Sequence, residues 1–136
     1  MDLAIPDPMK LHADKPEIHT ITAHGDGWVA INGERHERSL ILNSTGVLLP
    51  WDCPRFEDLT EAHFQALLSA CAEPPELALF GCGAQWQFPR PALLQPLISQ
   101  RIGVETMDTP AACRTFNILA GEGRRVVVGL LIGPDR

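Results

Sequence analysis

The sequence predicts an α/β fold: a three-layer domain with a central mixed, partly parallel sheet, an N-terminal antiparallel β meander and about three helices. An alternating segment broken by glycine turns fills the first part of the chain, and short, unbroken apolar runs separated by helical patterns fill the rest. Unbroken apolar runs suit strands covered on both faces. Helices between such strands imply crossover connections, which make the sheet partly parallel.

The meander is predicted over residues 18–43, where apolar residues roughly alternate with polar ones. Two glycine turns, HGDGW and INGER, interrupt this segment, and the second contains the Asn-Gly pair that type I′ hairpins prefer. An extended segment in STGVLLPWDCP follows and is expected to end at Pro50.

The first helix is predicted after this segment, with Asp58 as its N-cap and Glu61 three residues on. Apolar residues over 64–71 recur at i, i+3, i+4 and i+7, which gives the helix one apolar face. The Pro74-Pro75 pair prevents the helix from continuing.

The rest of the chain alternates between strand and helix. ELALF and VETM are predicted strands, and RRVVVGLLI is predicted to be the last strand. ALLQPLISQRI has a helical pattern that contains Pro96, so this helix either starts near Pro96 or is kinked there. The next helix is expected to start with Thr109 as its N-cap and Pro110 in its first turn.

Length and composition indicate one folded domain. The chain has 136 residues, of which 45% are hydrophobic and 21% charged, and these are ordinary values for a globular protein. We expect a single domain over 17–132, a loose N-terminal tail over 1–16 and a short C-terminal tail over 133–136.

Charge and hydropathy exclude several partners. The formal charge is −6 and basic residues form no block, so we expect no nucleic acid partner. No segment has the ~20 apolar residues of a membrane span, so we expect no membrane insertion. The start MDLAIPDPMKLHADKPE resembles neither a signal nor a transit peptide, so we expect a cytoplasmic protein.

No pattern for a metal or cofactor is present. The four cysteines form no C-x-x-C pair, which argues against structural zinc and against a disulfide framework. GCGAQW fails as a dinucleotide fingerprint because Trp86 stands where the third glycine is needed. A P-loop and an H-E-x-x-H zinc motif are also absent, so we expect no cofactor and no metal.

Several segments together resemble the Mth-type domain family. They are VLLPW, ELALFGCG and GVETMDTPAACRTFNILAGEGRRVVVGLLI, and the resemblance covers about residues 17–132. That family includes mitochondrial complex I assembly factor 3, the adipogenesis-associated Mth-domain protein and uncharacterised bacterial and archaeal relatives. The resemblance implies a three-layer α/β domain with no known catalytic activity, and its mitochondrial member is regarded as an assembly helper for a membrane respiratory complex. Where relatives often carry Gly-Thr-Gly, this chain has Gly81-Cys82-Gly83.

The candidate binding surface joins the strand end at GCG to the start of the next helix, because ligands of open α/β sheets sit beyond the carboxyl ends of strands. Its residues are Gly81, Cys82, Gly83, Trp86, Cys113, Arg114 and Asn117.

Three of these residue types leave alternatives open. Arg114 is an anion clamp, or it pairs with a nearby acid: Glu105, Asp108 or Glu122. Cys113 is a thiolate nucleophile near a helix start, or a small packed side chain. The two glycines admit a ligand, or they form a tight turn.

The leading hypothesis is a non-enzymatic binding domain that helps to assemble a membrane respiratory complex through protein partners, namely complex subunits or assembly proteins. The alternative is a small-molecule-binding protein or a thiol-dependent enzyme that uses a pocket between the Gly81–Gly83 loop and the helix near Pro110. A third hypothesis is a purely structural homodimer module.

Overall fold

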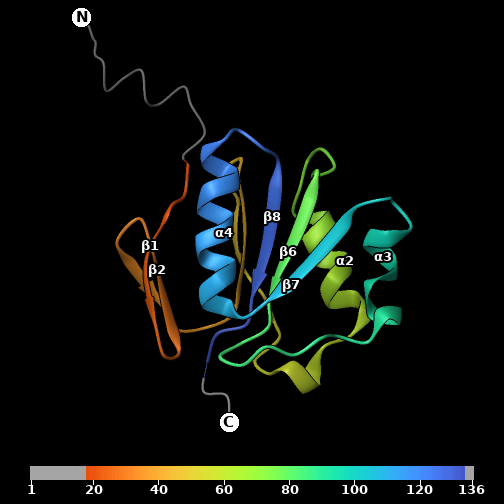
Figure 1. Ribbon diagram of the computed structural model, residues 1–136, viewed down its shortest axis with the longest axis horizontal. Helices are drawn as coiled ribbons and strands as arrows, with labels where there is room; N and C mark the ends of the chain where they lie inside the picture. The colour runs from red at the N-terminus through yellow and green to blue at the C-terminus, as the bar shows by residue number, and fades with distance from the viewer. Residues whose placement is uncertain (1–17, 134–136) are drawn as a thin grey trace, which may run out of the picture.

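The computed structural model describes residues 18–133 and contains two sheets (Figure 1). The predicted tail over 1–16 lies outside the described residues, as do residues 134–136. The small sheet has the order β1-β2-β3 and the large one the order β5-β4-β8-β6-β7. The strands are β1 (Ile21–Gly25), β2 (Trp28–Ile31), β3 (Glu34–His36), β4 (Leu40–Asn43), β5 (Leu48–Pro50), β6 (Leu77–Gly81), β7 (Gly103–Met107) and β8 (Val126–Leu130).

The small sheet is the predicted antiparallel meander, but it ends earlier than the sequence suggested. Asn32 and Gly33 have φ angles of 51° and 86°, and two positive φ values are what a type I′ turn requires. The segment 40–43, predicted as part of the meander, instead forms β4 of the large sheet, between β5 and β8. Its four residues are all buried, so the alternation typical of a meander strand does not extend to them.

The large sheet is mixed and partly parallel, as predicted. Strand β6 runs parallel to both β7 and β8, whereas β4 runs antiparallel to β8 and β5. Strand β8 is buried along its whole length, which explains why its sequence reads as an unbroken apolar run.

Helices cover both faces of the large sheet and complete three layers (Figure 1). Helix α4 packs on one face, between the sheet and β1, while α2 and α3 lie on the other. The helices are α2 (Glu61–Ser69), α3 (Gln95–Ile98) and α4 (Thr109–Gly121), with short 3-10 turns η1 (Phe56–Asp58) and η2 (Pro91–Leu94). The predicted α/β class is therefore confirmed.

Local hydrogen bonds and the helix bounds settle three predictions about helix starts. Asp58 lies in η1, and Thr60 is the N-cap of α2, where its backbone N–H donates to His63 Nδ1 at 2.9 Å. Asp108, not Thr109, caps α4, because its carboxylate accepts from the Ala111 N–H at 2.8 Å. Of the two possibilities for Pro96, the late start is correct, since α3 begins at Gln95.

Candidate functional site

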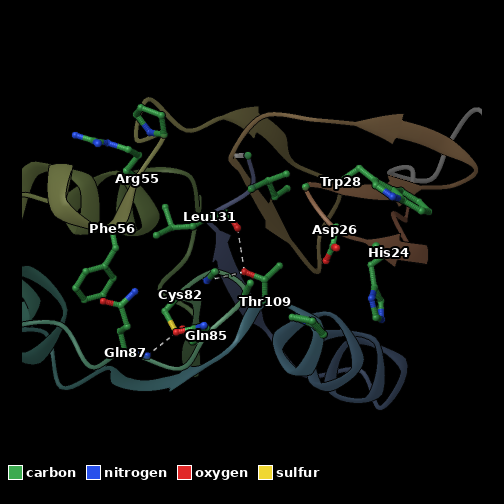
Figure 2. A pocket seen from close by; sticks show the side chains of 18 of the residues that line it. His24, Asp26, Trp28, Arg55, Phe56, Cys82, Gln85, Gln87, Thr109 and Leu131 are labelled. Atoms are coloured by element: carbon green, nitrogen blue, oxygen red, sulfur yellow. Dashed lines mark hydrogen bonds between the residues drawn. The ribbon is translucent and has the colours of Figure 1, made fainter. Parts of the chain in front are cut away.

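The ends of β6 and β8 and the start of α4 are tied together by one threonine (Figure 2). The Thr109 hydroxyl donates to Leu131 O at 3.0 Å and accepts from the Gly83 N–H at 2.9 Å. The Thr109 N–H donates to Gly83 O at 2.8 Å. This buried hydroxyl is unavailable for helix capping, and it fixes three chain segments at one end of the sheet.

The two glycines of the GCG segment have structural roles. A Cβ on Gly81 would lie 2.9 Å from Leu130 Cδ2 and 3.2 Å from Thr109 Cα, so only glycine lets the start of α4 approach β6 this closely. Gly83 has a φ of 109°, in the region that favours glycine. Gly81 and Gly83 therefore form a tight strand-to-loop turn, which is one of the two interpretations given above for these glycines.

Cys82 organises the loop that follows β6. Its thiol donates to Gln85 O at 3.4 Å and accepts from the Gln87 N–H at 3.1 Å. Burial raises the pKa of this thiol above its ordinary value, so Cys82 stays protonated at neutral pH. Both of its hydrogen-bond partners are backbone groups, and this is the geometry of a structural thiol.

An open hollow of about 630 Å³ lies beside this loop (Figure 2). It is lined by residues 24–28, 54–57, 82–85, 87, 109–110 and 131–133. Of the seven predicted site residues, Cys82 and Gly83 line it. Between residues 18 and 133 no thiol is hydrogen-bonded to a histidine, and no group of three His, Cys, Asp or Glu side chains is arranged to hold a metal. Cys82, the one thiol among the residues that line the hollow, therefore has no histidine base beside it.

Cys113 lies away from the hollow, in the core between α4 and the meander, and is 1% exposed. Burial raises its pKa to about 12, and the neighbouring Arg114 charge lowers it only in part. A thiol in this state is neither accessible nor ionised, so its placement favours the packed side chain over the nucleophile.

Asn117 joins α4 to the meander, a role that sequence reasoning missed. Its Oδ1 accepts from the Ile21 N–H at 3.0 Å and its Nδ2 donates to Ile21 O at 2.8 Å. The amide thus completes the backbone pairing at the start of β1. An asparagine four residues after a buried Cys113 was the available signal, but its partner is 96 residues away in the sequence.

Arg114 is exposed on α4 and makes no ion pair within the described part of the chain. It lies about 60° around the helix from Asn117, whose side chain contacts β1. Glu105, Asp108 and Glu122, the acids suggested by the sequence, do not pair with it among residues 18–133.

Trp86 and Phe88 lie at a different place, next to β7 at the edge of the large sheet. Their rings are 5.8 Å apart between centroids, and the two side chains are 60% and 59% exposed. The Trp86 indole Nε1 donates to Thr106 O of β7 at 3.2 Å. The seven predicted residues therefore do not meet on one surface, and Phe88 joins Trp86 as an exposed aromatic pair.

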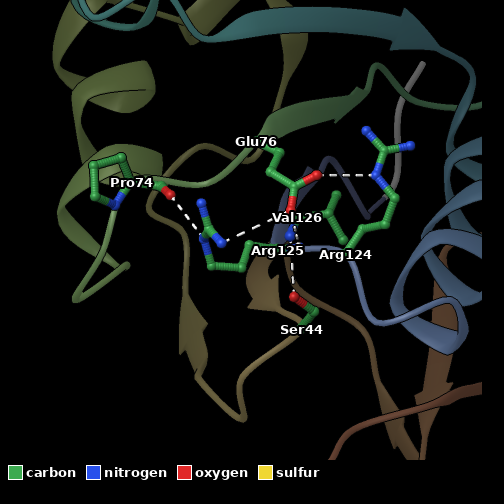
Figure 3. A network of polar contacts seen from close by, with 6 residues as sticks. All are labelled: Ser44, Pro74, Glu76, Arg124, Arg125 and Val126. Carbon is green, nitrogen blue, oxygen red and sulfur yellow. Dashed lines mark hydrogen bonds and ion pairs between the residues drawn. The ribbon is translucent and has the colours of Figure 1, made fainter.

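The Glu-Gly-Arg-Arg segment, a distinctive part of the sequence, holds the opposite end of β6 and β8 (Figure 3). Arg124 Nε lies 3.0 Å from Glu76 Oε1, and the Arg125 N–H donates to Glu76 Oε2 at 3.3 Å. Hydrogen bonds from Arg124 and from the Arg125 backbone lower the pKa of the Glu76 carboxyl. This network is partly exposed and links the segments that precede β6 and β8.

The mixed five-stranded sheet between two helical layers, with the three-stranded meander packed on α4, defines an α/β domain of the Mth938-like kind. The chain belongs to the family described as a protein of unknown function (DUF498/DUF598), whose pattern matches residues 21–131. The solution structure of a Bordetella pertussis Mth938-like domain is 32% identical, with a TM-score of 0.73 over 99% of this chain and 94% of that one. The resemblance seen in the sequence is thus confirmed.

Among curated relatives, the chain is similar to proteins named NADH dehydrogenase [ubiquinone] 1 alpha subcomplex assembly factor 3. The Bos taurus protein is 30% identical over 125 residues, which are 91% of this chain and 66% of that protein. The Mus musculus protein is 37% identical over 94 residues, which are 65% of this chain and 50% of that protein. The chain thus spans between half and two thirds of the length of these relatives. Over residues 18–133, none of its helices has the length and apolar character needed to cross a membrane.

Proposed function

We propose that this protein is a non-enzymatic binding domain that assists the assembly of a membrane respiratory complex of the complex I kind. The observation that carries the proposal is the similarity to relatives named as assembly factors for NADH dehydrogenase. Its partners are then complex subunits or other assembly proteins, and it needs no cofactor. The raised thiol pKa values of Cys82 and Cys113 support binding over thiol catalysis.

The proposed contact surface centres on the Trp86–Phe88 pair. Exposed aromatic side chains are favourable anchors at interfaces, because they bury a large area with few rotatable bonds. Gly81, Cys82 and Gly83 hold the loop that presents the pair, through the backbone bonds described above. Cys113 is buried under α4, Asn117 joins that helix to β1, and Arg114 is a second exposed group on the same helix.

A complementation experiment tests this proposal. In a bacterial host that lacks its own copy of the gene, we would compare the wild type with a Trp86→Ala, Phe88→Ala variant. Leu49→Ala is the matched control, because Leu49 is also an exposed apolar side chain but lies on β5, at the opposite edge of the sheet. The readouts are NADH:quinone oxidoreductase activity of membranes and the amount of fully assembled complex on native gels.

We expect the wild type and the Leu49 variant to restore both readouts, and the double variant to restore neither while accumulating to a normal level. If deletion of the gene leaves assembly unchanged, the assembly role is wrong. If the double variant restores assembly fully, the role stands but the aromatic pair does not serve it.

The proposal also places the protein in the cytoplasm. All four cysteines are free, which suits a reducing compartment. Fractionation of the same cells, probed for the tagged protein, tests this part: recovery with the periplasmic fraction would contradict it.

A further inference from the structure

Strand β7 has an outer side that no strand covers among residues 18–133, because β7 is the last strand of the large sheet. Met107 O accepts from the Cys82 N–H at 2.9 Å, so the backbone groups of Met107 face inward. Backbone groups of successive strand residues point to alternate sides, so those of Val104 and Thr106 face outward. Within the described chain, no protein group pairs with the N–H of either residue.

The Trp86 indole occupies the outer side of Thr106 in the way that a neighbouring strand would. Its N–H donates to Thr106 O, the acceptor that a sixth strand would use. Besides its N–H, Thr106 has a second unpaired group: its buried Oγ1 has no hydrogen-bond partner among residues 18–133. Buried hydroxyls are normally paired, so this edge is incompletely satisfied while Trp86 lies there.

The charge of β7 decides what kind of strand fits. Glu105 is exposed and is the only charged residue of β7. A second copy of this chain, paired antiparallel through both Val104 and Thr106, would place Glu105 directly opposite its own copy. Like charges directly opposite each other destabilise a strand pair, and the formal charge of −6 on each chain adds to the repulsion. A strand with a basic residue opposite Glu105 would form a favourable pair of opposite charges.

From these observations we infer that an extended segment of a partner protein adds to β7 as a further strand and displaces the Trp86 indole from Thr106. The segment carries a basic residue opposite Glu105 and apolar residues that pack against the freed Trp86 ring and Phe88. Strand addition of this kind takes its affinity from backbone hydrogen bonds and its specificity from alternate side chains. The inference rests on the proposed function, since it specifies how the aromatic pair takes part in binding.

The test is an NMR titration of the ¹⁵N-labelled protein with an octapeptide of alternating valine and lysine. We expect the amide signals of Val104 and Thr106 and the indole signal of Trp86 to shift together. The matched probes are a valine–glutamate octapeptide and the valine–lysine peptide N-methylated at alternate residues, and neither should produce these shifts. N-methylation blocks pairing without any change to the protein.

Two variants sharpen the result. Trp86→Phe keeps an aromatic ring but removes the competing donor, so binding should tighten about fivefold, the size of one net hydrogen bond. Val104→Pro removes an outward N–H that β6 does not use, so it should abolish binding while the rest of the spectrum stays native.

The inference is overturned if the peptide produces no shifts at millimolar concentration, if the shifts fall outside β7, or if the glutamate peptide acts equally. Concentration-dependent shifts of Val104 and Thr106 without peptide would identify a second copy as the occupant. The complementation experiment separates the two proposals. If the aromatic double variant fails there but Val104→Pro restores assembly, strand addition is wrong and the assembly role stands.

Discussion

Gly129 of β8 lies under the buried ring of Trp51, and Gly129→Ala should be strongly destabilising. A Cβ at this position would lie 2.8 Å from two ring atoms of Trp51 and 2.9 Å from Leu67 Cδ2, inside the 3.4 Å at which ordinary contact begins. The ring cannot easily move away, because its Nε1 donates to His63 O at 3.0 Å and its face and edges meet Phe64 and Phe80.

Overpacking of this kind costs about 1–3 kcal/mol, and the fixed ring puts the expected loss in the upper half, about 2–3 kcal/mol. For a domain of this size that corresponds to a Tm lower by roughly 8–12 °C. Urea unfolding followed by far-UV circular dichroism measures the loss directly, and near-UV signals report the altered Trp51 environment.

Gly121→Ala is the matched control, because no atom lies within 4 Å of the added Cβ at the end of α4. Alanine is the better helix former there, so we expect a gain of about 0.5–1 kcal/mol. If both variants shift the unfolding midpoint equally, or if Gly129→Ala changes stability by less than about 0.5 kcal/mol, the core is looser around Trp51 than we argue.

Three further predictions follow from the contacts described. Asn117→Ala leaves both backbone groups of Ile21 unpaired and should cost about 2 kcal/mol, with faster amide exchange over β1; unchanged exchange there would contradict the pairing. Cys113, with a pKa of about 12, should resist thiol reagents at pH 8 until the protein unfolds; labelling at the rate of a free thiol would refute its burial. The pKa of Glu76 is lower in the folded state than its ordinary value of 4.5, so its pairing stabilises the fold above that pH and is lost as the pH falls through the folded pKa. The stability difference between wild type and Glu76→Gln should therefore shrink on acidification below about pH 4.5, and a difference that is constant with pH would exclude this linkage.

Much of the fold could be predicted because short sequence patterns indicate its turns and buried strands. The Asn32-Gly33 turn follows from the residues that tolerate positive φ, and the buried strands β6 and β8 follow from unbroken apolar runs. One error is the assignment of 40–43 to the meander, and the others lie at helix starts, where several residues compete for one cap. Asp108 and Thr109 are both good N-cap residues, and Asp108 takes the role because the Thr109 hydroxyl is used by Gly83 and Leu131.

The candidate site was harder to predict, since it depends on which side of an element each residue faces. Cys113 and Arg114 are neighbours in the sequence, yet one is buried against the meander and the other is exposed. The glycines of the GCG segment predict a site at this loop, but the exposed aromatic pair that the loop presents includes Phe88, which is not one of the seven predicted residues.

By itself, then, the sequence determined the α/β class, the mixed sheet and the family, because periodicity, turn residues and the MDTPAACRTFN segment are local properties of the chain. Only the tertiary structure decided that β4 leaves the meander for the large sheet, that Asn117 pairs with Ile21, and that Trp86 lies on the edge of β7. These three facts join residues 20 to 96 positions apart or depend on strand order, and such pairings are fixed by the packing of the whole domain and not by any short segment.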